Sequence, residues 1–129
     1  MKLFNFIFIS IIFIAGILLS NETFAQQQDQ YLPFAEVMPQ PDGGIGSIYK
    51  HITYPEMARK AGIEGKVYAL IYINENGGVD DVKILKSLGA GCDEAAIAGI
   101  KSVKFTPGKN KGVPVKVKLS LAITFKIQQ

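Results

Sequence analysis

The sequence predicts an α+β domain with a three-stranded antiparallel or mixed sheet, in the strand order second–first–third, and two helices on one face. Three patterns support this: alternating apolar residues on both sides of Asn76-Gly77, helically spaced apolar residues after Cys92, and a second alternation from Val115 to Ile127. Periods of two and of about 3.6 residues are typical of half-buried strands and of amphipathic helices, respectively. A chain of 129 residues allows one such domain.

The first predicted helix spans residues 55–61 and follows a short helical segment over residues 47–52. Ser47 is the expected N-cap of the short segment, because its hydroxyl can accept a hydrogen bond from a free backbone N–H. Pro55 suits the first turn of the longer helix, and Gly62 suits the position just after its end.

The first two strands form a predicted hairpin over residues 65–87. Asn76-Gly77 indicates its turn, since both residues tolerate positive φ. Val79 and Val82 are out of phase along the return strand, which predicts a bulge near Asp80-Asp81.

The second predicted helix places Cys92, Ala96, Ile100 and Val103 on one face. A lysine-rich loop over residues 106–112 leads to the last strand, Val115–Ile127. The crossover through the helix places this strand beside the first one, so we expect it to form an open edge of the sheet.

The N-terminus has the pattern of a secretory signal peptide over residues 1–25. It combines Lys2, the uncharged run Leu3–Leu19 and a signal-peptidase site with small residues at positions −3 and −1, Thr23 and Ala25. The alternative is a short uncleaved anchor, because a run of about 17 apolar residues is at the short end for crossing a bilayer. Polar residues 26–43 are assigned to a linker and residues 44–129 to the domain.

Composition excludes several classes of function. The net charge of +3 comes mostly from lysine, and Arg59 is the single arginine, so the sequence lacks the arginine forks of specific nucleic-acid readers. The lone Cys92 cannot form an internal disulfide. We find no glycine-rich phosphate loop and no metal-ligand spacing, so we expect neither a cofactor nor a bound metal.

Chemistry remains an alternative at two places. Cys92 begins a helix, where a thiol pKa tends to fall, and His51 could serve as its base; the competing interpretations are a core cysteine and a structural histidine. Asp80-Asp81 is interpreted as a solvated turn rather than an acid pair.

A stripe of Tyr68, Leu70 and Tyr72 is expected to face away from the helices. It is either an association surface or ordinary cross-strand packing, and the sequence leaves both open.

Several stretches together resemble the C-terminal domain of TonB-type energy transducers, in the version typical of Bacteroidetes. They are "MPQPDGG" (38–44), "YPEMARKAGIEGKV" (54–67), "INENGGVDDVKILKS" (73–87) and the run from "GCDEAA" (91–96) through "FTPGKNKG" (105–112) to Ile127.

The resemblance implies that the last strand accepts a TonB-box segment of an outer-membrane transporter by strand addition, in energy-coupled transport. The implied partner-binding residues, which act through their backbone, are Val115, Lys116, Val117, Lys118, Leu119, Ser120, Leu121, Ala122, Ile123, Thr124, Phe125 and Lys126. No catalytic residue is implied. The expected location is the periplasm after cleavage, or the inner membrane, facing the periplasm, if residues 1–25 stay as an anchor.

The chain departs from the family pattern in three ways. Residues 1–25 contain no histidine, which a transducer needs to engage its proton-driven inner-membrane motor. The linker is short, and Ala122 stands where the family usually has proline. The alternatives are therefore an anchored transducer with that motor as a partner, a stand-alone envelope adaptor or modulator, a homodimer joined through sheet edges, and an enzyme using Cys92.

Overall fold

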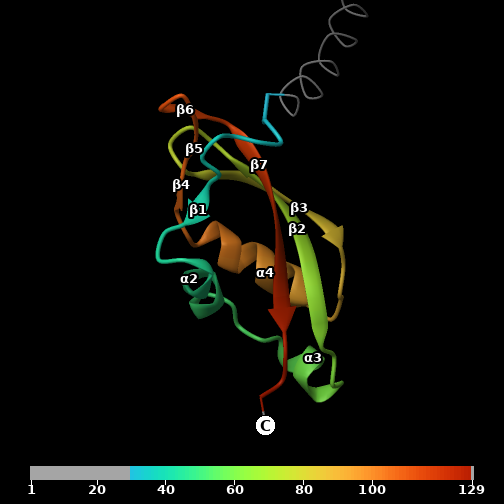
Figure 1. Cartoon of the computed structure of the whole chain (residues 1–129). Coiled ribbons are helices and arrows are strands. Elements are labelled where there is room, and N and C mark those ends of the chain that lie inside the picture. Colours follow the sequence, from blue (N-terminus) through green and yellow to red (C-terminus); the bar gives the residue numbers. More distant parts are fainter. Residues whose placement is uncertain (1–29, 129) are drawn as a thin grey trace, which may run out of the picture. The chain divides into compact units, whose positions relative to one another are not determined.

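The computed structural model describes residues 30–128; the predicted signal peptide or anchor over residues 1–25 lies outside them. The central sheet contains β2 (Gly65–Ile73), β3 (Val79–Lys86) and β7 (Val117–Phe125). Its strand order is β3-β2-β7, with both pairs antiparallel, and Figure 1 shows β2 between the other two strands. The predicted α+β class and second–first–third order are confirmed.

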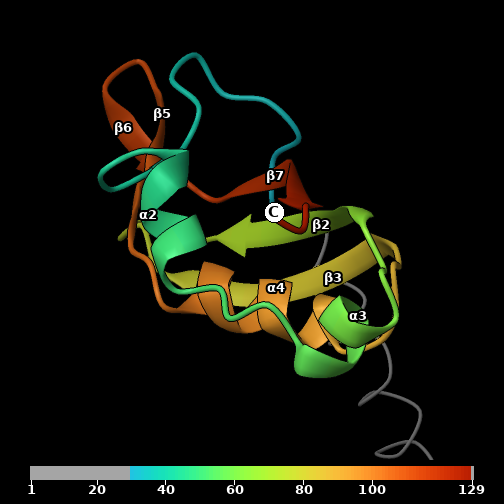
Figure 2. The ribbon, with the colours of Figure 1, turned by 90° about the horizontal axis from the view of Figure 1, so that it is seen from below.

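Three helices are described: α2 (Ile45–Lys50), α3 (Glu56–Lys60) and α4 (Cys92–Lys101). Figure 2 shows them on the same side of the sheet. Their apolar side chains pack with one face of β2 and β7 in a core that includes Ile48, Ala58, Val67, Ala69, Ile71, Ile73, Cys92, Ala96, Ile100, Ile123 and Phe125. No helix between residues 30 and 128 has the length and apolarity needed to cross a membrane.

The start of α2 differs from the prediction. The helix begins at Ile45 with Gly44 as its N-cap, and the Ser47 hydroxyl donates to the Gly44 carbonyl at 2.7 Å. Gly43 and Gly44 adopt φ values of 82° and 79°, which a residue with a side chain adopts only at a cost. These two glycines let the chain enter the helix before Ser47, so the expected N-cap role of Ser47 is wrong.

The β2–β3 hairpin has the predicted turn and bulge. Asn74 N–H donates to Gly78 O at 2.9 Å, and Gly77 has a φ of 83°. The register passes from Tyr72↔Asp81 to Ile73↔Val79, which leaves Asp80 without a partner and confirms the bulge. A second register shift, which skips Leu85, was not predicted.

The predicted lysine-rich loop contains a small hairpin of β5 (Gly108–Asn110) and β6 (Val113–Val115). Its turn is possible because Lys111 and Gly112 have φ values of 50° and 76°. Val115 pairs with Gly108 in this hairpin, and β7 starts only at Val117. The thirteen-residue alternation is therefore divided between two strands, and β7 has nine residues.

Residues 31–41 differ from an extended linker, because they pair with the domain at three places. Leu32 bridges to Val117 in parallel, Val37 bridges to Lys109 in antiparallel, and β1 (Gln40–Pro41) pairs with β4 (Phe105–Thr106). We call residues 31–37 the strap. Figure 2 shows this segment running past the β5–β6 hairpin toward β7.

Candidate functional site

The outer edge of β7 is the candidate site. On its inner side, β7 pairs with β2 over its full length, from Val117↔Ile73 to Phe125↔Gly65. In an antiparallel pair, the residues of one strand direct their backbone groups alternately to the partner and away from it. The Lys118 N–H donates outward to Leu32 O at 3.0 Å, so the outward-facing residues of β7 are Lys118, Ser120, Ala122 and Thr124.

Two contacts occupy the ends of this edge. At one end Leu32 donates its N–H to Lys116 O at 2.8 Å and accepts from Lys118 N–H. At the other end the Tyr49 hydroxyl accepts a hydrogen bond from Thr124 N–H at 3.0 Å. We call these the Leu32 contact and the Tyr49 contact.

The middle of the edge is open. Among residues 30–128, no group is hydrogen-bonded to the outward N–H groups of Ser120 and Ala122, and both residues are exposed. Unpaired strand groups of this kind are a template for another strand. What this site offers is therefore a row of backbone donors and acceptors rather than a catalytic group.

Lysines lie on both sides of the open part. Lys116 and Lys118 flank it at one end, and Lys126 follows β7 at the other. Lysines on an edge disfavour indiscriminate pairing, and they favour a partner strand that carries acidic residues.

The twelve predicted partner-binding residues fall into three places. Val115 belongs to the β6 hairpin, Lys116 joins β6 to β7, and Lys126 follows the last residue of β7. The remaining nine, Val117–Phe125, form β7 itself. The residues that direct their backbone N–H and C=O groups toward β2 are Leu119, Leu121, Ile123 and Phe125. Leu32 and Tyr49 were not predicted as part of the site, because neither lies in a periodic pattern that would connect it to β7.

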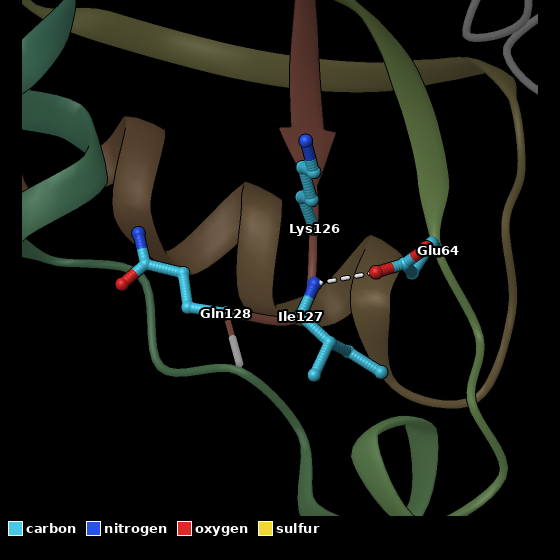
Figure 3. Close-up of a pocket in the computed structure, with 4 residues that line it drawn as sticks. All are labelled: Glu64, Lys126, Ile127 and Gln128. Carbon is cyan, nitrogen blue, oxygen red and sulfur yellow. Dashed lines mark hydrogen bonds between the residues drawn. The ribbon is translucent and has the colours of Figure 1, made fainter.

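An open hollow of about 630 Å³ lies where β7 ends, lined by Glu64, Lys126, Ile127 and Gln128. Figure 3 shows the Glu64 carboxylate reaching the backbone N–H of Ile127, which it accepts at 2.8 Å. This bond continues the pairing one step beyond β7 and holds the C-terminal segment beside the start of β2. The described residues contain no group of acidic, histidine or cysteine side chains suited to a metal ion.

The proposed cysteine–histidine chemistry finds little support. Cys92 is fully buried, and its burial, followed by the charges of Asp93 and Glu94, raises the pKa of its thiol. His51 is exposed, with Nδ1 2.8 Å from Ser47 O, and within the described part of the chain no hydrogen bond joins it to Cys92. A buried, protonated thiol is a poor nucleophile.

Asp80 and Asp81 do not form an acid pair with each other. Asp80 accepts from the Asn74 amide at 2.8 Å and from the Tyr31 hydroxyl, while Asp81 accepts from Val82 N–H at 2.8 Å. Both are exposed, as the interpretation as a solvated turn requires.

The face of the sheet opposite the helices is only partly covered. Tyr72 is buried because the Tyr31 ring packs edge-on against it, with centroids 5.0 Å apart. Tyr68 lies beneath Lys86, whose Nζ is 5.7 Å from the ring centroid. Within this stripe, packing inside the molecule therefore accounts for Tyr72 and for one side of Tyr68.

The fold and the edge together define a class: small α+β domains in which helices cover one face of a three-stranded sheet and the last strand has an open edge. Residues 50–127 match the family model described as Gram-negative bacterial TonB protein C-terminal. The chain belongs to this family, as the sequence resemblance indicated.

Known proteins agree with this assignment. The chain is 38% identical over 76 residues to Protein TonB of Vibrio cholerae; the match covers 58% of this chain and 31% of that protein. The chain therefore corresponds to about a third of its relative's length. The family consists of transport energy transducers rather than enzymes.

Two solved structures share the fold. The NMR structure of the Helicobacter pylori TonB C-terminal domain has a TM-score of 0.53 and 30% identity, covering 65% of this chain and 89% of that one. The corresponding Pseudomonas aeruginosa domain has a TM-score of 0.51 and 30% identity, covering 60% and 80%.

Proposed function

We propose that this protein is a periplasmic TonB-like domain that binds an outer-membrane transporter by adding the transporter's TonB box as a strand along β7. The transport would be energy-coupled. The observation that carries the proposal is the pair of unpaired, outward-facing N–H groups at Ser120 and Ala122.

Strand addition accounts for the chemistry of this edge. Backbone hydrogen bonds provide affinity, and alternate side chains of the partner provide selectivity. The membership of residues 50–127 in the TonB family supports a transporter as the source of the strand.

A proline substitution on the open edge tests this function. In Ser120→Pro the residue loses an outward N–H, whereas the bonds between β7 and β2 come from Leu119 and Leu121 and remain. We expect TonB-box peptides of the organism's own transporters to bind about tenfold more weakly, since the peptide loses a backbone bond and keeps an unpaired acceptor.

The matched control is Ser120→Ala, which keeps the N–H and should bind as the wild type does. Ala122→Pro provides a second position with the same outward geometry if Ser120→Pro does not fold, as judged by its amide spectrum. Unchanged peptide affinity in a folded proline variant would contradict strand addition at β7.

A second candidate function is a stand-alone envelope adaptor or modulator without energy transduction. The strap favours this function because it shortens the linker that an anchored transducer would need. With residues 31–41 paired to the domain, only residues 26–30 remain between the domain and the predicted anchor over residues 1–25. Five extended residues span at most about 18 Å. The mass of the mature N-terminus distinguishes the two: Gln26 as the first residue excludes an anchored transducer.

A further inference from the structure

We propose that the strap is a built-in competitor for the β7 edge: Leu32, with Tyr31 anchored beside it, occupies one end of the partner's site and must leave it before a longer strand can pair there. This inference rests on the proposed function, since it concerns the same edge. It adds a regulatory segment, and the strap lies outside residues 50–127, which match the family model.

The Leu32 contact already uses the edge as an added strand would. Its two backbone bonds, at 2.8 and 3.0 Å, engage Lys116 O and Lys118 N–H in the parallel sense. A partner strand that extends past Ser120 toward Val117 needs these same two groups. The strap and such a partner therefore exclude each other.

The pairing is built to be short. Backbone groups alternate along a strand, so the next bonds to β7 would come from Phe34, which would donate its N–H to Lys118 O and accept from Ser120 N–H. Among residues 30–128 neither bond forms, so the pairing ends at Leu32. Leu32 is 38% exposed, and Phe34, at 80% exposed, adds little buried apolar area. The Leu32 contact therefore consists of two backbone bonds and one partly exposed side chain.

Side-chain contacts hold the strap on both sides of Leu32. On one side Tyr31 donates to Asp80 and packs on Tyr72, with Lys116 Nζ 5.5 Å from its ring centroid. On the other side Glu36 N–H donates to Asn110 Oδ1 at 2.8 Å, and Lys111 N–H donates to Glu36 Oε2 at 3.0 Å.

The hydrogen bonds at Glu36 keep the strap attached to the domain when residues 31–35 detach. A segment held at one end stays close to its site, so it competes at a high effective concentration even though its own contact is short. A partner that binds the exposed Ser120–Ala122 part first could then displace Leu32 residue by residue.

The experiment compares peptide affinity in variants of the full chain. Tyr31→Ala removes the tie beside Leu32, and Leu32→Pro removes the N–H that pairs with Lys116. If the strap covers its end of the site in about nine of ten molecules, each variant binds TonB-box peptides about tenfold more tightly. Phe34→Ala is the matched control, because this exposed side chain lies on the strap, and it should leave the affinity unchanged.

Hydrogen exchange of the Lys118 amide tests the strap without any peptide. In the wild type we expect the Lys118 amide to exchange more slowly than the free Ser120 amide and faster than the Leu119 amide, which is bonded within the sheet. In Tyr31→Ala its rate should approach that of Ser120. Protection equal to that of Leu119 would overturn the proposal, because the strap would then open only on unfolding.

The outcomes separate the two proposals. If wild-type protein binds the peptide at Ser120 and Ala122 but the strap variants bind no more tightly, the strap proposal fails and the function stands. If no peptide binds at this edge in any variant, the function fails, and exchange at Lys118 still decides whether the strap opens.

Discussion

At the scale of single residues, Gly77 occupies a position where the fold cannot accommodate a side chain. Gly77, in the turn between β2 and β3, has a φ of 83°, and a Cβ built there would lie 1.8 Å from the Phe105 carbonyl oxygen. Phe105 also donates its N–H to Gly77 O at 2.9 Å. The turn is therefore fastened to the segment that leads from α4 to β7, and the Asn-Gly pair serves that contact as well as the hairpin.

Gly77→Ala should lower the free energy of unfolding by about 2–4 kcal/mol, since backbone strain and a steric clash act together. Gly62→Ala is the matched control: its φ is 68°, but nothing lies within 4 Å of the added Cβ. That change should cost only about 1–2 kcal/mol of backbone strain. Urea denaturation measures both, and equal losses would contradict the clash at Phe105.

Tyr31 should titrate abnormally. Burial, followed by the hydrogen bond to Asp80 and nearby acidic charges, raises the pKa of Tyr31 from 10.0 to about 12. The folded protein thus holds this proton more tightly than the unfolded chain. The resulting stabilisation is complete below about pH 10 and is lost as the pH rises through about 12.

Urea denaturation of wild-type protein and Tyr31→Phe from about pH 9 to about pH 12 measures this loss, since the variant keeps the ring against Tyr72 but cannot ionise. The stability difference between the two should shift against the wild type with rising pH. A difference that stays constant across this range would contradict a half-buried phenol that is hydrogen-bonded to Asp80.

At the scale of elements, the sequence predicted what local periodicity encodes. The alternation of Val67, Ala69, Ile71 and Ile73 indicated β2 and its buried face, and the mismatch of Val79 with Val82 located the bulge at Asp80. The order β3-β2-β7 followed from the hairpin and the crossover. The strand and the bulge depend on residues close together in the chain, and the strand order follows from a general rule for crossover connections.

Features that depend on distant residues were not predictable in this way. The strap has no apolar period, and Glu36 meets its partners Asn110 and Lys111 across 74 and 75 residues. The alternation from Val115 to Ile127 continues through Lys116, so periodicity alone could not show that β6 ends and β7 begins there. The Lys111-Gly112 pair is a weak turn signal for the β5–β6 hairpin, because lysine rarely adopts the positive φ that it has here.

The edge of β7 makes its own prediction for hydrogen exchange in the free protein. Leu119, Leu121 and Ile123 direct their N–H groups to β2 and should exchange slowly, whereas Ser120 and Ala122 should exchange fast. Thr124 should be intermediate because of the Tyr49 contact and should approach Ser120 in Tyr49→Phe. Uniform protection along β7 would mean that something already covers this edge.

At the scale of the molecule, an open edge bounded by the Leu32 contact and the Tyr49 contact fits a binding domain better than an enzyme. The buried Cys92 and exposed His51 form no hydrogen-bonded pair among the described residues. The open middle of the β7 edge, and the outer edge of β3, which pairs with no strand among residues 30–128, also leave dimerisation by strand pairing as an alternative. Sedimentation at several protein concentrations distinguishes a dimer from a monomer with a free β7.

The central claim is that β7 accepts a partner strand, and amide NMR during titration with TonB-box peptides tests it most directly. We expect the largest shifts and new exchange protection at Ser120 and Ala122, with Leu119 and Leu121 little changed because their bonds to β2 persist. Binding without these changes at β7, or no binding by any transporter's peptide, would contradict the account.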